Sequence, residues 1–283
     1  MELPFDPNLR LGPLMVSWHG IFTAVGIFFG VGLPIRLLRG RVSEDDGYAI
    51  ATWGVIGGII GARLFHVLDL FSYYVEHPEQ ILFIWTGGIA VWGAVIGGIL
   101  GGYLVALRRK VPIGITADAA VSGLGLGLAI GRIGDIINGE HHAIECTVGI
   151  CVSYTHPESL GQGPLLQGAR YSPGPVHLAV GYEMIYVLAI VGLALWLFTR
   201  RDRSGEGSAI RRTLVPGAIF WGFIFLYGLG RLAISSLRIA DPTSFLDLRQ
   251  DQLVGLASMI VSVPALLYVL RRARARGTPA APA

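Results

Sequence analysis

The sequence predicts an all-α protein, a polytopic bundle of about seven helices that span a membrane. Of its 283 residues, 53% are hydrophobic and 14% are charged, whereas soluble domains carry about 25% charged residues. Seven apolar stretches are long enough to cross about 30 Å of hydrocarbon at about 1.5 Å per residue. In addition, the segments that connect these stretches are alternately rich and poor in Lys and Arg. We expect one membrane-embedded domain over residues 1–276 and a disordered tail over 277–283.

The predicted spans follow one another closely except for one long connection. They lie near residues 14–37, 48–71, 81–107, 114–137, 176–198, 214–235 and 252–270. The N-terminus is acidic and Pro-rich, and the first stretch is long enough to span, so we expect no cleaved signal peptide. The longest connection, 138–175, is rich in Gly, Pro, Ser and His. Long connections often carry function, and we expect this one to form a small extracytoplasmic cap.

The basic residues predict the orientation of the chain. Cytoplasmic loops of membrane proteins are enriched in Lys and Arg. The side that we assign to the cytoplasm carries Arg36, Arg39, Arg41, Arg108, Arg109, Lys110, Arg200, Arg201, Arg203, Arg211, Arg212, Arg271, Arg272, Arg274 and Arg276. The opposite side carries only Arg10, Arg170, Arg238 and Arg249. We therefore expect the N-terminus outside and the C-terminus in the cytoplasm.

The two cysteines, Cys146 and Cys151, both lie in the predicted cap. Two are too few for a disulfide scaffold. They could form one bridge if the cap faces an oxidising compartment.

Three arginines, Arg63, Arg132 and Arg231, fall inside predicted spans. Each lies about 15–18 residues from the cytoplasmic start of its span, or about 22–27 Å from that face. A charge at this depth costs at least about 2.5–3.5 kcal/mol on insertion scales and is a functional candidate. Each arginine could instead reach the interface separately. Their common depth favours convergence on a shared anion, most simply a phospholipid phosphate.

Residues 131–140 end the fourth span with a guanidinium, two carboxylates and a carboxamide, in the order Gly-Arg-Ile-Gly-Asp-Ile-Ile-Asn-Gly-Glu. Taken alone, this stretch could be a helix end followed by an Asn-Gly turn. Patterned glycines within the spans (57–61, 97–102 and 123–127) favour close helix packing. They do not indicate a nucleotide site, because no strand–turn–helix context surrounds them.

This stretch resembles the signature of the bacterial prolipoprotein diacylglyceryl transferase family. Similar motifs follow in the family's order: Trp18-His19-Gly20, Gly61-Ala62-Arg63, the run 85–98, and Tyr227-Gly-Leu-Gly-Arg231 with Leu237-Arg238 and Asp241. The resemblance covers nearly the whole chain. It implies a multi-pass enzyme of the bacterial plasma (inner) membrane, with its active site towards the outer leaflet. The implied reaction, the first step of lipoprotein maturation, transfers the diacylglyceryl group of phosphatidylglycerol to a lipobox cysteine, forming a thioether and releasing glycerol 1-phosphate.

The resemblance also implies the site residues. Displacing a phosphate ester requires cations near the developing charge, and the planar fork of arginine suits phosphate oxygens. Asn138 could instead only turn the chain, and Tyr227 could be interfacial packing. The expected catalytic residues are Arg132, Arg231, Asp135 and Glu140, and the expected substrate-binding residues are Arg132, Arg63, Asn138, His19, Tyr227 and Arg238.

Several positions depart from the family pattern. Asp135 stands where Asn is usual, and Tyr is commoner than His19 in some members. Trp92 replaces a histidine argued to be catalytic in some members, and Ser235 stands where a Glu is often found. The usual His-Pro element before the fifth span is reduced to Val176-His177-Leu178. The identity of the general base therefore stays open.

The implied partners are phosphatidylglycerol, prolipoprotein signal peptides with a lipobox cysteine, and membrane lipids. We expect no nucleic acid, cofactor or metal, and a monomer. One alternative is a divergent, inactive paralogue. Another is a membrane anion or lipid transporter, although no internal repeat is visible. A seven-helix photoreceptor is excluded, because the single lysine, Lys110, lies in a loop rather than a span.

Overall fold

Helices dominate the computed structural model, which describes residues 1–12, 14–83, 90–140, 143–162, 174–205, 208–239, 243–245 and 248–277. Six described helices are long and apolar enough to cross a membrane. They are α1 (Trp18–Leu37), α2 (Glu44–Asp69), α5 (Ile113–Asn138), α6 (Ala179–Arg203), α8 (Ala218–Ser235) and α9 (Gln250–Gly277). Another apolar helix, α4 (Val91–Arg108), is shorter. The predicted polytopic helical membrane protein is confirmed.

Four predicted spans begin later than the sequence indicated, and one of them is the sixth, whose helix α8 starts at Ala218 rather than near 214. Residues Leu14–Ser17 form strand β3, so the first helix starts at Trp18. The third helix starts at Val91 rather than near 81, because Pro78–Leu82 form a 3-10 turn, η1. The fifth starts at Ala179, after strand β5. Apolar composition alone does not separate the end of a helix from an apolar strand beside it.

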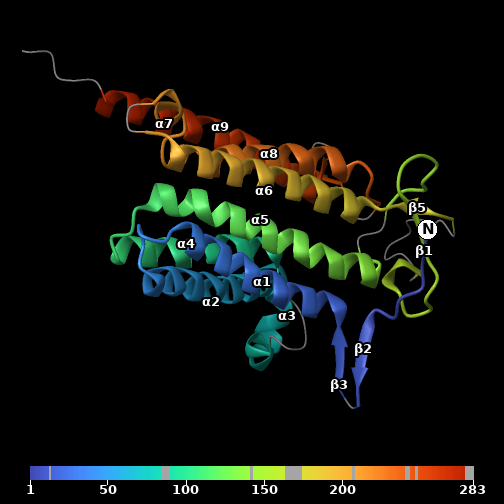
Figure 1. The fold of residues 1–283 in the computed structure, drawn as a ribbon. Helices are drawn as coiled ribbons and strands as arrows, with labels where there is room; N and C mark the ends of the chain where they lie inside the picture. Colours follow the sequence, from blue (N-terminus) through green and yellow to red (C-terminus); the bar gives the residue numbers. More distant parts are fainter. Residues whose placement is uncertain are drawn as a thin grey trace, which may run out of the picture. The chain divides into compact units, whose positions relative to one another are not determined.

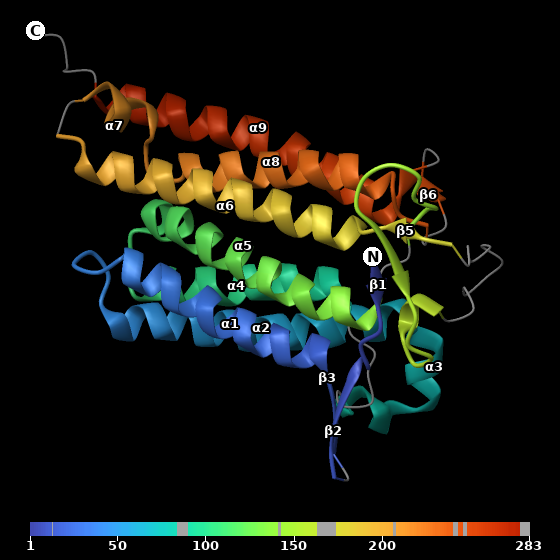
Figure 2. The same ribbon diagram turned by 45° about the vertical axis from the view of Figure 1, so that its right-hand side comes forward.

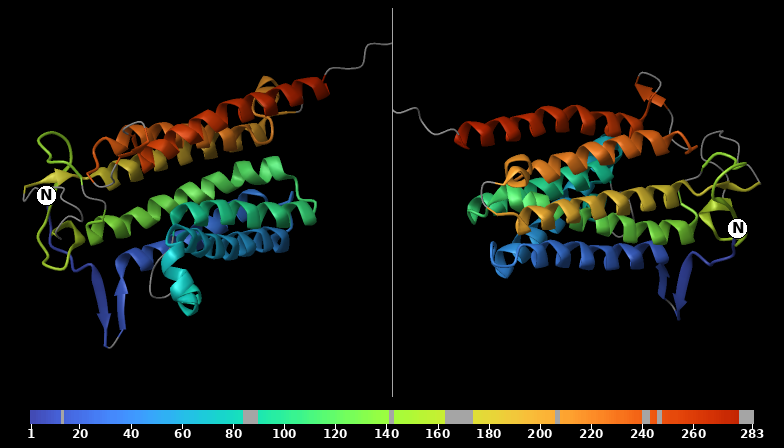
Figure 3. Two further views of the ribbon diagram at one scale, coloured as in Figure 1. Left: turned by 180° about the vertical axis from the view of Figure 1, so that it is seen from behind. Right: turned by 45° about the horizontal axis from the view of Figure 1, so that its top comes forward.

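The chain divides into two compact units, Pro34–Thr116 and the combination of Met1–Leu33 with Ala117–Ala283. In the unit 34–116, α2 and α4 lie side by side (Figure 3). Glycines allow their backbones to approach closely: a Cβ added at Gly97 would lie 2.1 Å from Gly57 O, and one at Gly61 would lie 2.1 Å from Gly93 O. A short helix, α3 (Phe71–Glu76), follows α2. The patterned glycines therefore serve helix packing, as predicted.

The larger unit contains α1 up to Leu33 together with α5, α6, α8 and α9. Helices α6, α8 and α9 run side by side (Figure 2). Glycines again set the close contacts: a Cβ at Gly26 would lie 2.6 Å from Gly127 O, and one at Gly228 would lie 2.6 Å from Gly255 O. A short helix, α7 (Ala209–Thr213), precedes α8.

A buried ion pair ties α5 to the region where α6 ends and α8 begins. The Asp118 side chain is fully buried and pairs with Arg201 of α6 at 2.5 Å. Its carboxylate also accepts hydrogen bonds from the backbone N–H groups of Gly217 (2.9 Å) and Phe220 (2.8 Å). These donors lie at the start of α8, where backbone N–H groups have no partner within the helix. Asp118 therefore caps α8 from a neighbouring helix.

Small sheets at one end of the larger unit add short strands to a fold that is mainly helical, as predicted. β1 (Glu2–Leu3), β4 (Cys151–Tyr154) and β5 (Val176–His177) form one sheet in the order β1-β4-β5. A hairpin of β2 (Asn8–Leu11) and β3 leads into α1 (Figure 1). Three further short elements are described: η3 (Leu160–Gln162) and the paired strands β6 (Thr243–Phe245) and β7 (Leu248–Arg249).

The described part of the predicted cap, 138–175, is not a span and contributes β4 and η3. It is larger than predicted, because β1 and β5 add strands to it. Leu3, Val152 and Leu178 form its buried core. Cys146 and Cys151 form a disulfide. Residues 278–283 of the predicted tail lie outside the described residues, and Gly277 ends α9.

We predict that Gly97→Val lowers the thermal unfolding midpoint of the detergent-solubilised protein. Overpacking of this kind costs about 1–3 kcal/mol, and the added side chain would meet the Gly57 backbone, which cannot rotate away. Gly102→Ala on the same helix is the matched control, because its Cβ would lie an ordinary 3.5 Å from Ile50. Equal midpoints for the two variants would contradict the packing interpretation.

Candidate functional site

Three arginines converge on one carboxylate near the start of α6. Glu183 Oε1 accepts hydrogen bonds from Arg132 Nη2 (2.9 Å) and Arg231 Nη1 (2.9 Å). Glu183 Oε2 accepts from Arg231 Nη1 (2.9 Å) and Arg238 Nη2 (2.6 Å). The Glu183 side chain is only 4% exposed. Helix α5, helix α8 and the segment after α8 thus deliver their guanidinium groups to a single buried acceptor.

The cluster keeps an excess of positive charge, because its three guanidinium groups are paired with two carboxylates, Glu183 and the Asp135 partner of Arg132. Burial lowers the pKa of Arg238, but a guanidinium starts near 12.5 or above and stays charged at neutral pH. Arg132 and Arg231 retain partial exposure, 15% and 19% of their side chains. The cluster can therefore accept an anion.

Donors also remain available in the described part of the cluster. Arg231 uses only Nη1 there, which leaves its Nε and Nη2. The buried Nε of Arg238 has no hydrogen-bond partner among the described residues. Buried donors are almost always paired in proteins. An oxygen-rich ligand would satisfy them.

Glycines position these arginines. A Cβ at Gly230 would lie 2.0 Å from the Tyr186 ring, so the residue before Arg231 has to be small for α8 to pack against α6. A Cβ at Gly134 would lie 2.6 Å from His19 Cα. Gly134 therefore allows the start of α1 to lie directly against α5, beside Arg132.

That close approach creates a second network around Asp135. His19 Nδ1 lies 2.5 Å from Asp135 Oδ1, and Arg132 Nη1 donates to Asp135 Oδ2 at 2.6 Å. The carboxylate is buried, with 3% of its side chain exposed, whereas 46% of the His19 side chain is exposed. Arg132 therefore connects both networks, since it binds Glu183 through one nitrogen and Asp135 through the other.

Asn138 and Glu140 lie next to this network. Asn138 Nδ2 donates to Ser17 Oγ (2.8 Å) and to Glu140 Oε1 (3.1 Å). Glu140 Oε2 lies 3.7 Å from His19 Nδ1. Gly139 between them adopts a left-handed conformation, φ 75°. The chain therefore turns at Gly139, directly after Asn138 ends α5, and the buried Asn138 Oδ1, which has no hydrogen-bond partner among the described residues, is a candidate acceptor for a ligand.

Arg63 belongs to the unit 34–116 and contacts backbone there. Its Nε donates to Ile81 O at 2.9 Å, and its Nη2 donates to Gln80 O. The guanidinium also lies over the Tyr74 ring, 5.2 Å from the centroid. These contacts hold the turn between α3 and α4. The expected role of Arg63 in lipid binding stays a prediction.

The remaining sequence candidates divide between the site and the scaffold. Tyr227 lies one helical turn before Arg231 and interacts electrostatically with the Glu183 cluster. Ser235 donates to Asp251 of α9. His177 lies 3.4 Å from the Tyr182 hydroxyl, in the cap. The Trp92 side chain and Asp241 lie outside the described residues.

One group in the described part of the chain has the spacing of a metal site. Ligand atoms of His19, Asp135 and Glu140 lie within 4.8 Å of one another. The hydrogen bonds favour another interpretation, because His19 Nδ1 is bonded to Asp135 and the Arg132 guanidinium already supplies positive charge to that carboxylate. A divalent cation there would lie beside a guanidinium. We interpret the group as a hydrogen-bonded network, and the expected absence of a metal stays a prediction.

Sequence reasoning missed Glu183, although a signal was present. A carboxylate within an apolar span is a functional candidate by the same rule that singles out an arginine. A search of the spans for basic residues alone finds Arg132 and Arg231 and overlooks the acid between them. Asp118 was missed for the same reason.

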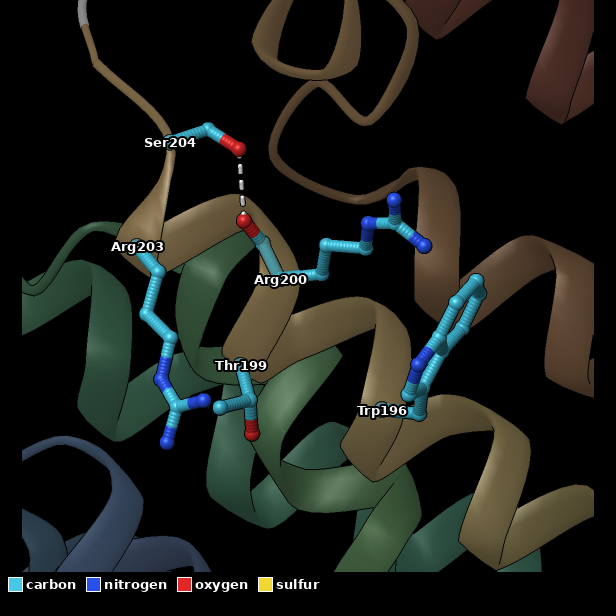
Figure 4. A pocket seen from close by; sticks show the side chains of 5 residues that line it. All are labelled: Trp196, Thr199, Arg200, Arg203 and Ser204. Carbon is cyan, nitrogen blue, oxygen red and sulfur yellow. Dashed lines mark hydrogen bonds between the residues drawn. The ribbon is translucent and has the colours of Figure 1, made fainter.

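A surface hollow at the other end of α6 does not belong to the site. It is lined by Trp196, Thr199, Arg200, Arg203 and Ser204 (Figure 4). Arg200 lies over the Trp196 ring, 5.0 Å from the centroid, and Ser204 donates to the Arg200 carbonyl at 2.7 Å. Its lining has no acidic group or strong nucleophile, unlike the network around Glu183.

The chain is similar to known proteins over most of its length. The family model described as prolipoprotein diacylglyceryl transferase matches residues 8–268. A phosphatidylglycerol–prolipoprotein diacylglyceryl transferase of Thermus thermophilus is 31% identical over 282 residues, with 93% of this chain and 96% of the relative covered. Proteins of the same name from Nostoc sp. (34% identical, 93% and 89% covered) and Synechococcus elongatus (33%, 94% and 88%) are also similar.

We predict that Glu183→Gln destabilises the folded protein. The change removes the charge that three guanidinium groups share, and breaking a buried ion pair costs about 3–5 kcal/mol. The measurement is the thermal unfolding midpoint in detergent. Glu158→Gln is the control, because Glu158 makes an exposed pair with Arg10 and surface pairs contribute little. An unchanged midpoint for Glu183→Gln would show that the cluster does not stabilise the fold.

Proposed function

The chain belongs to the prolipoprotein diacylglyceryl transferase family, and we propose that Arg132 and Arg231 hold the phosphate of phosphatidylglycerol during the transfer of its diacylglyceryl group to a lipobox cysteine thiol. The observation that carries this proposal is the convergence of three arginines on one carboxylate. Their excess charge and unused donors match an anionic phosphodiester. Arginine presents a planar fork to such oxygens.

Besides removal of the thiol proton, the reaction needs positioning and charge stabilisation from the enzyme. The thiolate sulfur attacks the glycerol carbon that carries the phosphate ester, an S–C bond forms, and the C–O bond breaks. The electron pair of that bond leaves on the phosphate oxygen, so negative charge grows on the leaving glycerol phosphate. Donors that are already in place for this charge are usually the largest catalytic term. Arg132 and Arg231 supply them.

Glu183 keeps the arginines ready before the lipid arrives. Without an acceptor, three like charges in a low-dielectric site would repel one another and move apart. The carboxylate holds the guanidinium groups together at 2.6–2.9 Å. Arg238 is the most buried of the three and acts mainly to fix Glu183. Asn138 offers its free Oδ1 as an acceptor for a hydroxyl of the glycerol headgroup.

The chain is a multi-pass membrane protein. We place it in the bacterial plasma membrane as a single domain over residues 1–276, with the cap outside and the site towards the outer leaflet. The disulfide between Cys146 and Cys151 supports this placement, because disulfides persist in oxidising compartments.

We predict that Arg132→Lys and Arg231→Lys each reduce transfer by about 10²–10³-fold, the usual cost of removing a donor to developing charge. Lysine keeps the charge, but its single nitrogen cannot reproduce the fork by which Arg132 binds Asp135 and Glu183 together. The assay follows the mass shift of a lipobox peptide in vesicles containing phosphatidylglycerol. Arg63→Lys should be milder, since Arg63 contacts backbone carbonyls.

Arg212→Lys, at an exposed arginine of α7, is the control for this series and should leave transfer unchanged. Full activity in Arg132→Ala and Arg231→Ala would refute the phosphate-binding role. Absence of transfer by the unmodified protein, at normal expression and folding, would instead favour an inactive member of the family.

Reporter fusions test the orientation. Fusions after Arg41, Arg109, Arg203 and the C-terminus should report the cytoplasm, and fusions near Ser72, Ser159 and Thr243 should report the outside, because basic residues concentrate in the cytoplasmic loops. A cytoplasmic signal at Ser159 would contradict the assignment of the cap and of the site to the outer side.

A further inference from the structure

We propose that His19 takes the proton from the incoming cysteine thiol and that Asp135 is its positioning residue. This inference rests on the proposed transferase function and assigns the base that the reaction needs. A thiol has a pKa near 8.5, so it reacts much faster once a neighbouring base removes its proton.

The contact between the two side chains sets the state of the imidazole. Asp135 Oδ1 lies 2.5 Å from His19 Nδ1. A carboxylate at this distance keeps the proton on Nδ1 and leaves Nε2 as the acceptor. The carboxylate is buried and 46% of the imidazole side chain is exposed. Asp135 therefore fixes the ring through Nδ1, and Nε2 is the nitrogen that stays accessible to a substrate.

Neither neighbouring carboxylate suits the role as well. Asp135 has one oxygen on His19 and the other on Arg132. Its negative charge is thus already paired with a guanidinium, which weakens it as a base. Glu140 accepts a hydrogen bond from Asn138 and lies 3.7 Å from His19 Nδ1. Glu140 therefore supports the imidazolium that forms after proton transfer.

Among the described residues, Tyr154 is another titratable group near Asp135. Burial, together with the charge of Asp135, raises the pKa of Tyr154 to about 12. Its phenol therefore stays protonated at neutral pH and does not compete as a base. In the described part of the chain, the charged and titratable groups around His19 and its partner include Asp135, Glu140, Arg132 and a neutral Tyr154.

The base and the phosphate site share one residue. Arg132 and Asp135 are three positions apart on α5, so their side chains lie on the same helix face. Arg132 binds Asp135 through Nη1 and Glu183 through Nη2. The thiolate that His19 generates would therefore lie within about one helical turn of Arg132, the arginine that holds the phosphate.

The step balances without any further reactant. The proton moves from the thiol sulfur to His19 Nε2. The S–C bond forms as the C–O bond to phosphate breaks, and the phosphate oxygen keeps the electron pair. His19 then releases its proton to the phosphate monoester or to water, which restores the neutral imidazole for the next turnover.

The test compares pH profiles of transfer in vesicles for the unmodified protein, His19→Gln and Asp135→Asn. We expect His19→Gln to lower kcat by about 10²–10⁴-fold at pH 7, the range of general-base catalysis, with the KM for phosphatidylglycerol nearly unchanged. The unmodified rate should level off once His19 is neutral. The His19→Gln rate should keep rising through the thiol pKa near 8.5, because the peptide then supplies its own thiolate.

Asp135→Asn should lower kcat less than His19→Gln, because an amide can still contact Nδ1 but no longer favours one tautomer. His77→Gln is the matched control and should match the unmodified protein, since His77 belongs to the unit 34–116, where it stacks on the exposed Tyr73 ring. Added imidazole should restore part of the activity of His19→Gly and none of that of Arg231→Ala.

Two outcomes overturn the proposal while leaving the transferase function intact. One is full activity of His19→Gln beside an active unmodified protein. The other is a loss in His19→Gln that is the same at every pH and that imidazole does not restore, which would make His19 structural. Inactivity of the unmodified protein would refute the proposed function itself, so the two failures are distinguishable.

Discussion

The site depends on one interaction, the sharing of Glu183 by three arginines. Charged groups inside a membrane protein are costly unless they are paired. Here the guanidinium groups outnumber the carboxylates that pair with them, so positive charge remains. The carboxylate satisfies enough donors to keep Arg132, Arg231 and Arg238 in place. It leaves a net positive charge and unused donors. A site with these properties is already in place before its ligand arrives, and its positive charge and unused donors can still bind an anion.

Close helix packing makes that interaction possible. Three segments must bring long side chains to one point, and two of them, α5 and α8, do so through a glycine that admits a neighbour. Gly134 lets His19 reach Asp135, and Gly230 lets α8 meet α6 at Tyr186. Association of helices within lipid relies on such small residues, because apolar side chains gain nothing from leaving lipid for each other. The same glycines that stabilise the bundle therefore set the geometry of the chemistry.

Much of this could be predicted from the sequence. Apolar stretches and rare charges indicated a polytopic bundle and picked out Arg132 and Arg231, because a buried charge is conspicuous in an apolar span. The starts of four helices could not be predicted, because apolar residues of β3, η1 and β5 and the residues just before α8 extend the pattern. The pairing of His19 with Asp135 joins residues 116 positions apart. No local pattern encodes such a contact.

A structure with phosphatidylglycerol bound, solved in lipid nanodiscs, tests the central claim most directly. The arginine cluster should receive the phosphate with Arg132 and Arg231 nitrogens about 2.7–2.9 Å from its oxygens, the range of charge-assisted hydrogen bonds, while Glu183 keeps its contact with Arg238. A phosphate bound elsewhere, with all three arginines still closed on Glu183, would show that the cluster is only a structural ion pair and would contradict the mechanism.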